Sequence, residues 1–268
     1  MNVLIRHDTV YEYNTPISSL ASEIHLRPLN NRRQIVESFR LQTDPSTHIY
    51  DYVDRFGNAV HHFTIPKLLH AVRVSAISQV STFPQPFVFR RPEGFLWYES
   101  LTQTRRTALD PLTQQWIRDH DNPHLPPRER VQRLSLAVQN NFLYEPGVTS
   151  VRDTASDFIQ HERGVCQDFA HFLISVFRHL HIPALYVSGY IVPEGSSPTA
   201  SHAWVAVHCE DTNGPAEWTG LDPVAGTLTD ERYVWIALGR DYDDVTPVHG
   251  VYWGNSDEHL TVTVQTEE

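Results

Sequence analysis

The chain has 268 residues, of which 40% are hydrophobic and 20% are charged, a composition typical of a folded protein rather than a disordered one. Acidic side chains outnumber basic ones by 32 to 21, which gives a formal net charge of −11, so we expect no nucleic-acid partner. No apolar run approaches the roughly 20 residues that a membrane-spanning helix needs, and residues 1–13 lack the pattern of a secretory signal. We therefore expect a cytoplasmic protein that does not bind membranes.

Residues 1–82 are predicted to form an antiparallel β domain. Runs of β-branched and aromatic residues, typical of strands, cover Val3–Tyr13, Ile35–Thr43, Ile49–Val53, Val60–Ile65 and Val72–Val80. Gly57-Asn58 lies between two of these runs, which is a good signal for a hairpin. No helical periodicity competes with the strand pattern in this part of the chain.

Residues 83–125 are predicted to be a packed connector. Pro84, Pro86 and Pro92 oppose sheet pairing in its first part, and the aromatic side chains among these prolines need burial. We therefore do not expect a loose linker here.

Residues 126–268 alternate between helical and strand-like patterns. Helices are predicted at Pro127–Asn141, Thr154–Arg163 and Cys166–His181, the last of them ended by Pro183. Strand-like runs follow at Ala184–Val192, His202–His208, Ala216–Leu221, Tyr233–Leu238, Val248–Trp253 and His259–Gln265. We expect the strands after Gly226 to extend or cap the sheet that the earlier runs form.

Three short segments carry side chains suited to nucleophilic catalysis. They are GVCQDFAHF at 164–172, SHAWVAV at 201–207 and GLDPV at 220–224. Cys166 begins an amphipathic helix, where unpaired backbone N–H groups and the helix dipole favour a thiolate over a thiol. His202 begins one predicted strand and Asp222 ends the next, so the three could form a nucleophile, a base and a group that orients the base.

These segments resemble the transglutaminase-like superfamily of papain-related folds. The run Phe142–Ala170 and the motifs HAWV and LDPV are similar in particular to the bacterial transglutaminase-like family, which carries a β-rich N-terminal domain. The resemblance implies an α+β fold, in which that domain precedes a papain-like core whose nucleophile helix packs on an antiparallel sheet. It also implies that Cys166 is the nucleophile, His202 the general base and acid, and Asp222 the residue that fixes the imidazole.

Other site residues are expected around the triad. The oxyanion hole needs a side-chain donor besides the backbone N–H of the nucleophile, and Gln160 and Tyr144 are the candidates. Trp204, on the strand face of the histidine, and Tyr190 are candidates to line the substrate cleft. Asp168 is expected to stabilise the helix dipole from the first turn. Cys209 has no comparable setting.

We expect cysteine-dependent acyl transfer on a peptide or protein amide, without a cofactor. The thioester would pass to water in a peptidase or amidase, which we favour, or to an amine in a transglutaminase. Two alternatives remain open: a binding or scaffold protein that keeps the fold, and a metal site made by Cys166, His202 and Asp222. No HExxH or CxxC motif is present. The identity of the substrate and the oligomeric state stay open.

Overall fold

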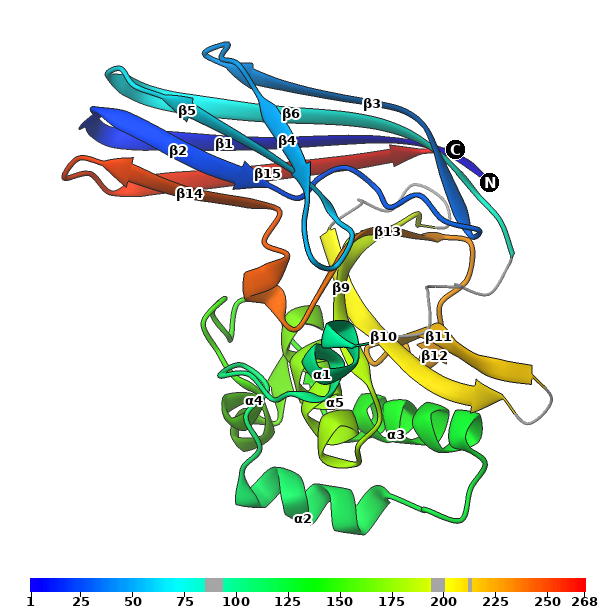
Figure 1. Cartoon of the computed structure of the whole chain (residues 1–268). Helices are drawn as coiled ribbons and strands as arrows, with labels where there is room; N and C mark the ends of the chain where they lie inside the picture. The colour runs from blue at the N-terminus through cyan, green and yellow to red at the C-terminus, as the bar shows by residue number, and fades with distance from the viewer. Residues whose placement is uncertain (85–93, 194–200, 212–213) are drawn as a thin grey trace.

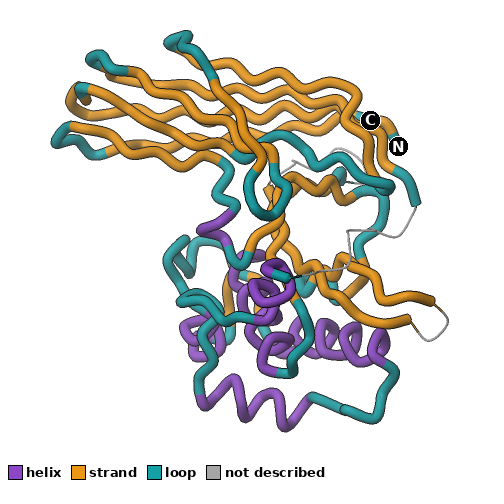
Figure 2. Tube along the Cα trace, viewed as in Figure 1, coloured by secondary structure: helices purple, strands orange, loops and turns teal. Residues whose placement is uncertain are grey.

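The computed structural model describes residues 1–84, 94–193, 201–211 and 214–268. Strands alone form the upper half of the molecule in Figure 1, and the helices lie in the lower half beside a second group of strands. Figure 2 shows this segregation directly. We call the upper half the β sandwich and the lower half the core. The predicted α+β fold is confirmed.

The β sandwich consists of two antiparallel sheets. Their strand orders are β15-β1-β6-β3 and β14-β2-β5-β4. The strands are β1 (Asn2–Ile17), β2 (Ser19–Ile24), β3 (Gln34–Asp44), β4 (Tyr50–Val53), β5 (Ala59–Ile65), β6 (Leu69–Thr82), β14 (Val248–Trp253) and β15 (Glu258–Glu267). Inward side chains alternate with outward ones along β6, as a sheet with one buried face requires. Ile17, Phe63 and Val72 are among the residues buried between the sheets.

The last two strands correct the predicted domain boundary. β15 pairs along nearly the whole of β1, from Leu4 opposite Glu267 to Tyr13 opposite Glu258, and β14 pairs with β2. The expectation that the strands after Gly226 extend or cap the core sheet is therefore wrong for β14 and β15, and a division at 126–268 cuts through the sandwich. Both ends of the chain build this domain, and they lie together in Figure 1.

The core is a five-stranded antiparallel sheet with helices on one face. Its order is β12 (Thr227–Leu228), β11 (Gly214–Asp222), β10 (Ser201–Asp211), β9 (Ala184–Ile191) and β13 (Tyr233–Gly239). Helix α5 (Cys166–His179) packs on β10 and β9 of this sheet, with α3 (Pro127–Asn141) and α4 (Ala155–His161) beside it. Its Phe169 and Phe172 meet Phe158 of α4. The predicted bounds of α3 are confirmed. α4 ends earlier than predicted, because Glu162 adopts a left-handed backbone with φ 55°.

The other face of the core sheet bears aromatic side chains and meets the sandwich. Trp204, Trp218 and Trp235 pack there with Leu29 and Phe56, which the sandwich contributes. This contact fixes the two halves against each other through buried apolar surface.

The connector holds two helices that the sequence analysis missed, α1 (Phe95–Leu101) and α2 (Pro111–His120). A side-chain cap begins α2, since the Asp110 carboxylate accepts the Thr113 N–H at 2.9 Å and Pro111 takes the first helical position. Trp116 of α2 packs edge-on against Phe172, so α2 belongs to the core. Most of the proline-rich and aromatic stretch, residues 85–93, lies outside the described residues. No helix among the described residues is long and apolar enough to cross a membrane.

Candidate active site

Cys166 is the first residue of α5, and the chain before it is held in a tight turn. The Asp168 carboxylate accepts the Val165 N–H at 2.8 Å and the Thr149 hydroxyl at 2.7 Å. A Cβ atom at Gly164 would lie 2.6 Å from Oδ2 of Asp168, so glycine leaves the room that this carboxylate occupies. Asp168 therefore stabilises the helix start, as expected, and fixes where the cysteine sits.

The structure brings Cys166, His202 and Asp222 together. His202 is the second residue of β10 and Asp222 the last residue of the neighbouring β11. Nε2 of His202 lies 2.9 Å from Oδ2 of Asp222, and the Cys166 side chain is near enough to the imidazole to raise its pKa. Because Nε2 faces the carboxylate, Nδ1 is the ring nitrogen left for the sulfur.

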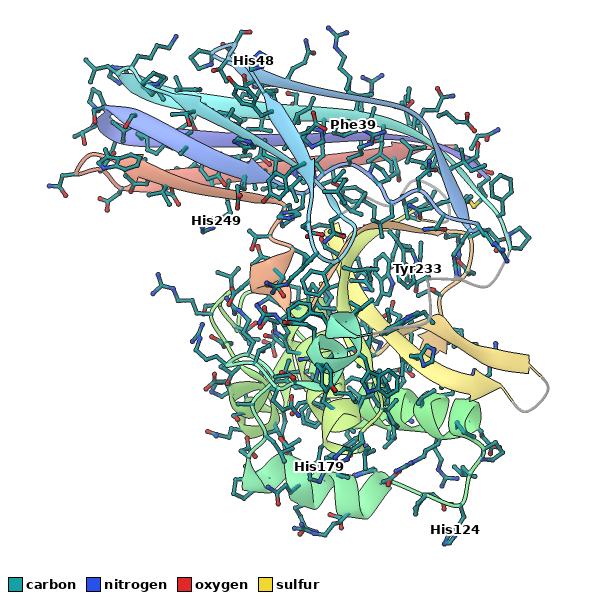
Figure 3. All side chains as sticks on the ribbon, in the orientation of Figure 1. Phe39, His48, His124, His179, Tyr233 and His249 are labelled. Atoms are coloured by element: carbon teal, nitrogen blue, oxygen red, sulfur yellow. The ribbon has the colours of Figure 1, made fainter. Side chains whose placement is uncertain are left out.

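Three further donors hold the Asp222 carboxylate. The Tyr233 hydroxyl donates to Oδ2 at 2.9 Å, and the backbone N–H groups of Val224 and Ala225 donate to Oδ1 at 2.9 and 3.3 Å. Tyr233 is the first residue of β13, and Figure 3 labels it beside that strand. The sequence analysis did not identify Tyr233, because nothing near it in the sequence links it to residue 222.

These contacts favour an imidazolium next to a carboxylate. Burial lowers the pKa of His202, but the hydrogen bonds and charges of Asp222 and Cys166 outweigh it and raise that pKa to about 10. Burial raises the pKa of Asp222, yet the bonds from His202, Tyr233 and Val224 bring it below its ordinary value. The Asp222 side chain is only 2% exposed, so both charges lie where water screens them little.

The Trp204 ring stacks on the imidazole of His202. It is fully buried, its ring lies 6.0 Å from the His202 ring at an interplanar angle of 29°, and it meets the Tyr233 ring edge-on at 5.2 Å. Gly189 makes room for it, since a Cβ there would collide with the indole and with the Val234 carbonyl oxygen. Trp204 is thus a packed support of the histidine and not an exposed cleft wall.

Tyr190 does not line an open cleft either. Its side chain is 3% exposed, and its hydroxyl lies 2.6 Å from Nδ1 of the buried His7 in β1. The prediction for Tyr190 as a cleft residue is therefore wrong. The residue joins the core to the sandwich, a contact that the sequence could not show because the partner lies at the other end of the chain.

The two oxyanion candidates have different surroundings. Tyr144 lies in the short strand β7 (Leu143–Tyr144), which pairs with β8 (Arg163–Gly164) directly before the nucleophile. Burial first, and then the charges of Cys166 and Asp222, raise the pKa of Tyr144. Gln160 is exposed on α4 and lines a surface depression with residues of α2, Phe142 and Glu162, but with none of the triad side chains.

Among the residues that the structure describes, no group of three or more His, Cys, Asp or Glu side chains is arranged to hold a metal ion. The metal alternative for Cys166, His202 and Asp222 therefore gains no support. Neither Cys166 nor Cys209 is in a disulfide.

Comparison with known proteins agrees with this architecture. Residues 3–81 match the model of the bacterial transglutaminase-like N-terminal region, and residues 114–223 match that of the transglutaminase-like superfamily. The uncharacterized protein ML0607 of Mycobacterium leprae is 31% identical over an alignment of 277 residues, gaps included, that covers 97% of this chain and 96% of that protein. The uncharacterized protein Rv2569c of Mycobacterium tuberculosis is 29% identical over 280 residues, covering 96% and 89%.

A solved structure shares the whole fold. It comes from a Cytophaga hutchinsonii protein described as a candidate cysteine protease, with a TM-score of 0.79 at 21% identity, over 100% of this chain and 91% of that one. The chain belongs to the transglutaminase-like superfamily and carries the bacterial transglutaminase-like N-terminal region.

Proposed function

We propose that the protein is an enzyme that transfers acyl groups from amides through a thioester on Cys166. The observation that carries the proposal is Cys166 at the tip of a helix beside His202, whose imidazole is hydrogen-bonded to the buried Asp222 carboxylate. A thiolate beside an imidazolium is the reactive form of a cysteine nucleophile, and a buried carboxylate keeps the imidazole oriented.

In the first step, the Cys166 thiolate attacks the amide carbon and the carbonyl oxygen becomes an oxyanion. As the first residue of α5, Cys166 has a backbone N–H that the helix does not use, so this group can donate to the oxyanion. The Tyr144 hydroxyl is the side-chain donor that we assign, because Tyr144 pairs with Gly164, two residues before the nucleophile, whereas Gln160 lines a depression without triad residues. The imidazolium of His202 then protonates the leaving amine, the C–N bond breaks and a thioester remains.

In the second step, neutral His202 takes a proton from the acceptor, which attacks the thioester and releases Cys166. We propose water as the acceptor, which makes the enzyme a peptidase or amidase. A primary amine in the same place would give a transglutaminase.

Mass spectrometry of the intact protein after incubation with peptide amides tests the proposal. We expect an acyl adduct on Cys166 that disappears with time in water and leaves a free acid as product. Cys209→Ala should behave like the natural protein, whereas Cys166→Ala should form no adduct and release no product. A product that carries an added primary amine in place of the acid would assign the transglutaminase reaction. Turnover by Cys166→Ala equal to that of the natural protein would refute the thioester mechanism.

A further inference from the structure

Two side chains of the β sandwich complete the free edge of the core sheet. β13 is the outermost strand of that sheet. The backbone N–H of its Trp235 donates to Oε1 of Gln34 at 2.9 Å, and the Trp235 carbonyl accepts a hydrogen bond from Nε2 of Gln34 at 2.7 Å. Leu238 does the same with Asn58, at 2.8 Å for its N–H and 2.7 Å for its carbonyl. Each amide thus makes the two hydrogen bonds that a residue of a neighbouring strand would make.

A bulge allows both residues to face the sandwich. In a regular strand, residues three apart direct their backbone groups to opposite edges. The register between β13 and β9 shifts between Trp235 and Ala237, so Trp235 and Leu238 present their groups on the same side. The irregularity is therefore matched to the spacing of the two amides.

Hydrogen bonds within the sandwich also orient both amides. Nε2 of Gln34 also donates to the Leu29 carbonyl at 2.7 Å, and Nδ2 of Asn58 also donates to the Asp54 carboxylate at 2.7 Å. The two residues are 0% and 1% exposed. Because residues of the sandwich orient each amide, the sandwich sets where the edge of β13 lies.

The same strand carries the phenol that holds the triad carboxylate. Tyr233 stands two residues before Trp235, and its hydroxyl donates to Oδ2 of Asp222, the oxygen that also faces His202. A shift of β13 would therefore move the hydroxyl relative to the shared carboxylate oxygen. Tyr233 also lies outside the two regions that match the family models, residues 3–81 and 114–223.

We propose that the β sandwich positions the active site: Gln34 and Asn58 hold the edge of β13, so that Tyr233 holds Asp222 in line with His202. Gln34 and Asn58 are positioning residues that act through Tyr233. The inference rests on the proposed function, because it assumes that the Cys166–His202 pair does the chemistry. It gives the N-terminal region a role in catalysis that needs no ligand of its own.

The rate at which iodoacetamide labels Cys166 shows whether these contacts are intact, and it can be measured without a substrate. Iodoacetamide labels thiolates, so the rate at pH 7 divided by the rate at pH 10 measures how much thiolate the imidazolium stabilises at neutral pH. A Cys209→Ser background leaves one thiol to label. Gln103→Ala is the matched control, since it removes an amide that donates to the Ser175 carbonyl at 2.9 Å and is not bonded to β13.

We expect Gln34→Ala and Asn58→Ala to lower this ratio by roughly threefold to tenfold, whereas Gln103→Ala leaves it unchanged. In a Tyr233→Phe background the same two substitutions should have no further effect, because the link through which they act is already removed. Gln34→Glu and Asn58→Asp keep the side-chain size but lose the donor, and they test the same expectation if the alanine variants do not fold.

Two results would overturn the inference. One is a loss of melting temperature in the Gln34 and Asn58 variants with an unchanged ratio, which would make the amides structural only. The other is a full effect that persists in the Tyr233→Phe background. If the natural protein itself shows no labelling at pH 7 above that of an ordinary thiol, the proposed function fails and the inference with it.

Discussion

Replacing Asp222 by asparagine would remove the charge that stabilises the imidazolium of His202. The His202 pKa stands at about 10 instead of 6.5, which corresponds to roughly 5 kcal/mol in favour of the charged ring, with burial acting in the opposite direction. The charges and hydrogen bonds of Asp222 and Cys166 supply this stabilisation. If Asp222 supplies half, Asp222→Asn loses roughly 2–3 kcal/mol, and the Cys166–His202 ion pair becomes roughly 30- to 150-fold less favourable.

The pH dependence of iodoacetamide labelling measures this loss. We expect Asp222→Asn to label much more slowly than the natural protein between pH 6 and 8, and the difference to shrink in alkaline solution. Asp230→Asn is the matched control, because Asp230 pairs with Arg232 and not with His202. Superimposable profiles for Asp222→Asn and the natural protein would show that Asp222 does not control the histidine.

Three other predictions concern separate parts of the molecule. Tyr144→Phe should lower kcat about 10²-fold with little change in KM, whereas Gln160→Ala should change neither, measured with the peptide amide of the mass-spectrometric assay. Burial lowers the pKa of His7 to about 4. As the pH falls from 6.5 to 4, His7 therefore becomes protonated in the unfolded chain but stays neutral in the folded protein, which favours unfolding. Denaturant titrations should show about 3 kcal/mol of stability lost over this range, and His7→Gln should lack that part of the loss; equal losses in both proteins would contradict it. Gly189→Ala should cost about 3 kcal/mol of unfolding free energy, because a Cβ there collides with Trp204 and a backbone oxygen, and a fully stable variant would disprove this packing.

Local patterns in the sequence were sufficient to predict many helices and strands of the core and the positions of three of its site residues. Helix α5 could be predicted because its apolar residues repeat at helical spacing up to Pro183, which ends the helix region. That placed Cys166 at a helix tip, and the strand runs around His202 and Asp222 placed the other two groups at strand ends. Short-range patterning decides such positions, so they can be found without knowing the fold.

The partners of the later strands could not be predicted in this way. β14 and β13 both read as short apolar strands, yet β14 joins the sandwich and β13 joins the core. Strand propensity reports that a segment is extended and half-buried, but it does not report which edge the segment covers. The pairing of β15 with β1 joins the two ends of the chain, and only the assembled sheets decide it.

The same limit explains why the supports of the triad were missed. Tyr233 of β13 bonds to Asp222 of β11, Trp204 packs over Gly189 of β9, and Gln34 reaches Trp235 from across the domain interface. Such contacts depend on strand order, on a missing Cβ and on a bulge, none of which leaves a periodic trace in the sequence. A nucleophile must sit at a particular local structure, whereas the groups that steady it need only arrive at the right place, and any strand that ends there can supply them. The supports of an active site are therefore the part that needs a structure: in this protein Tyr233 stands on a core strand whose outer edge is bonded to Gln34 and Asn58 of the sandwich.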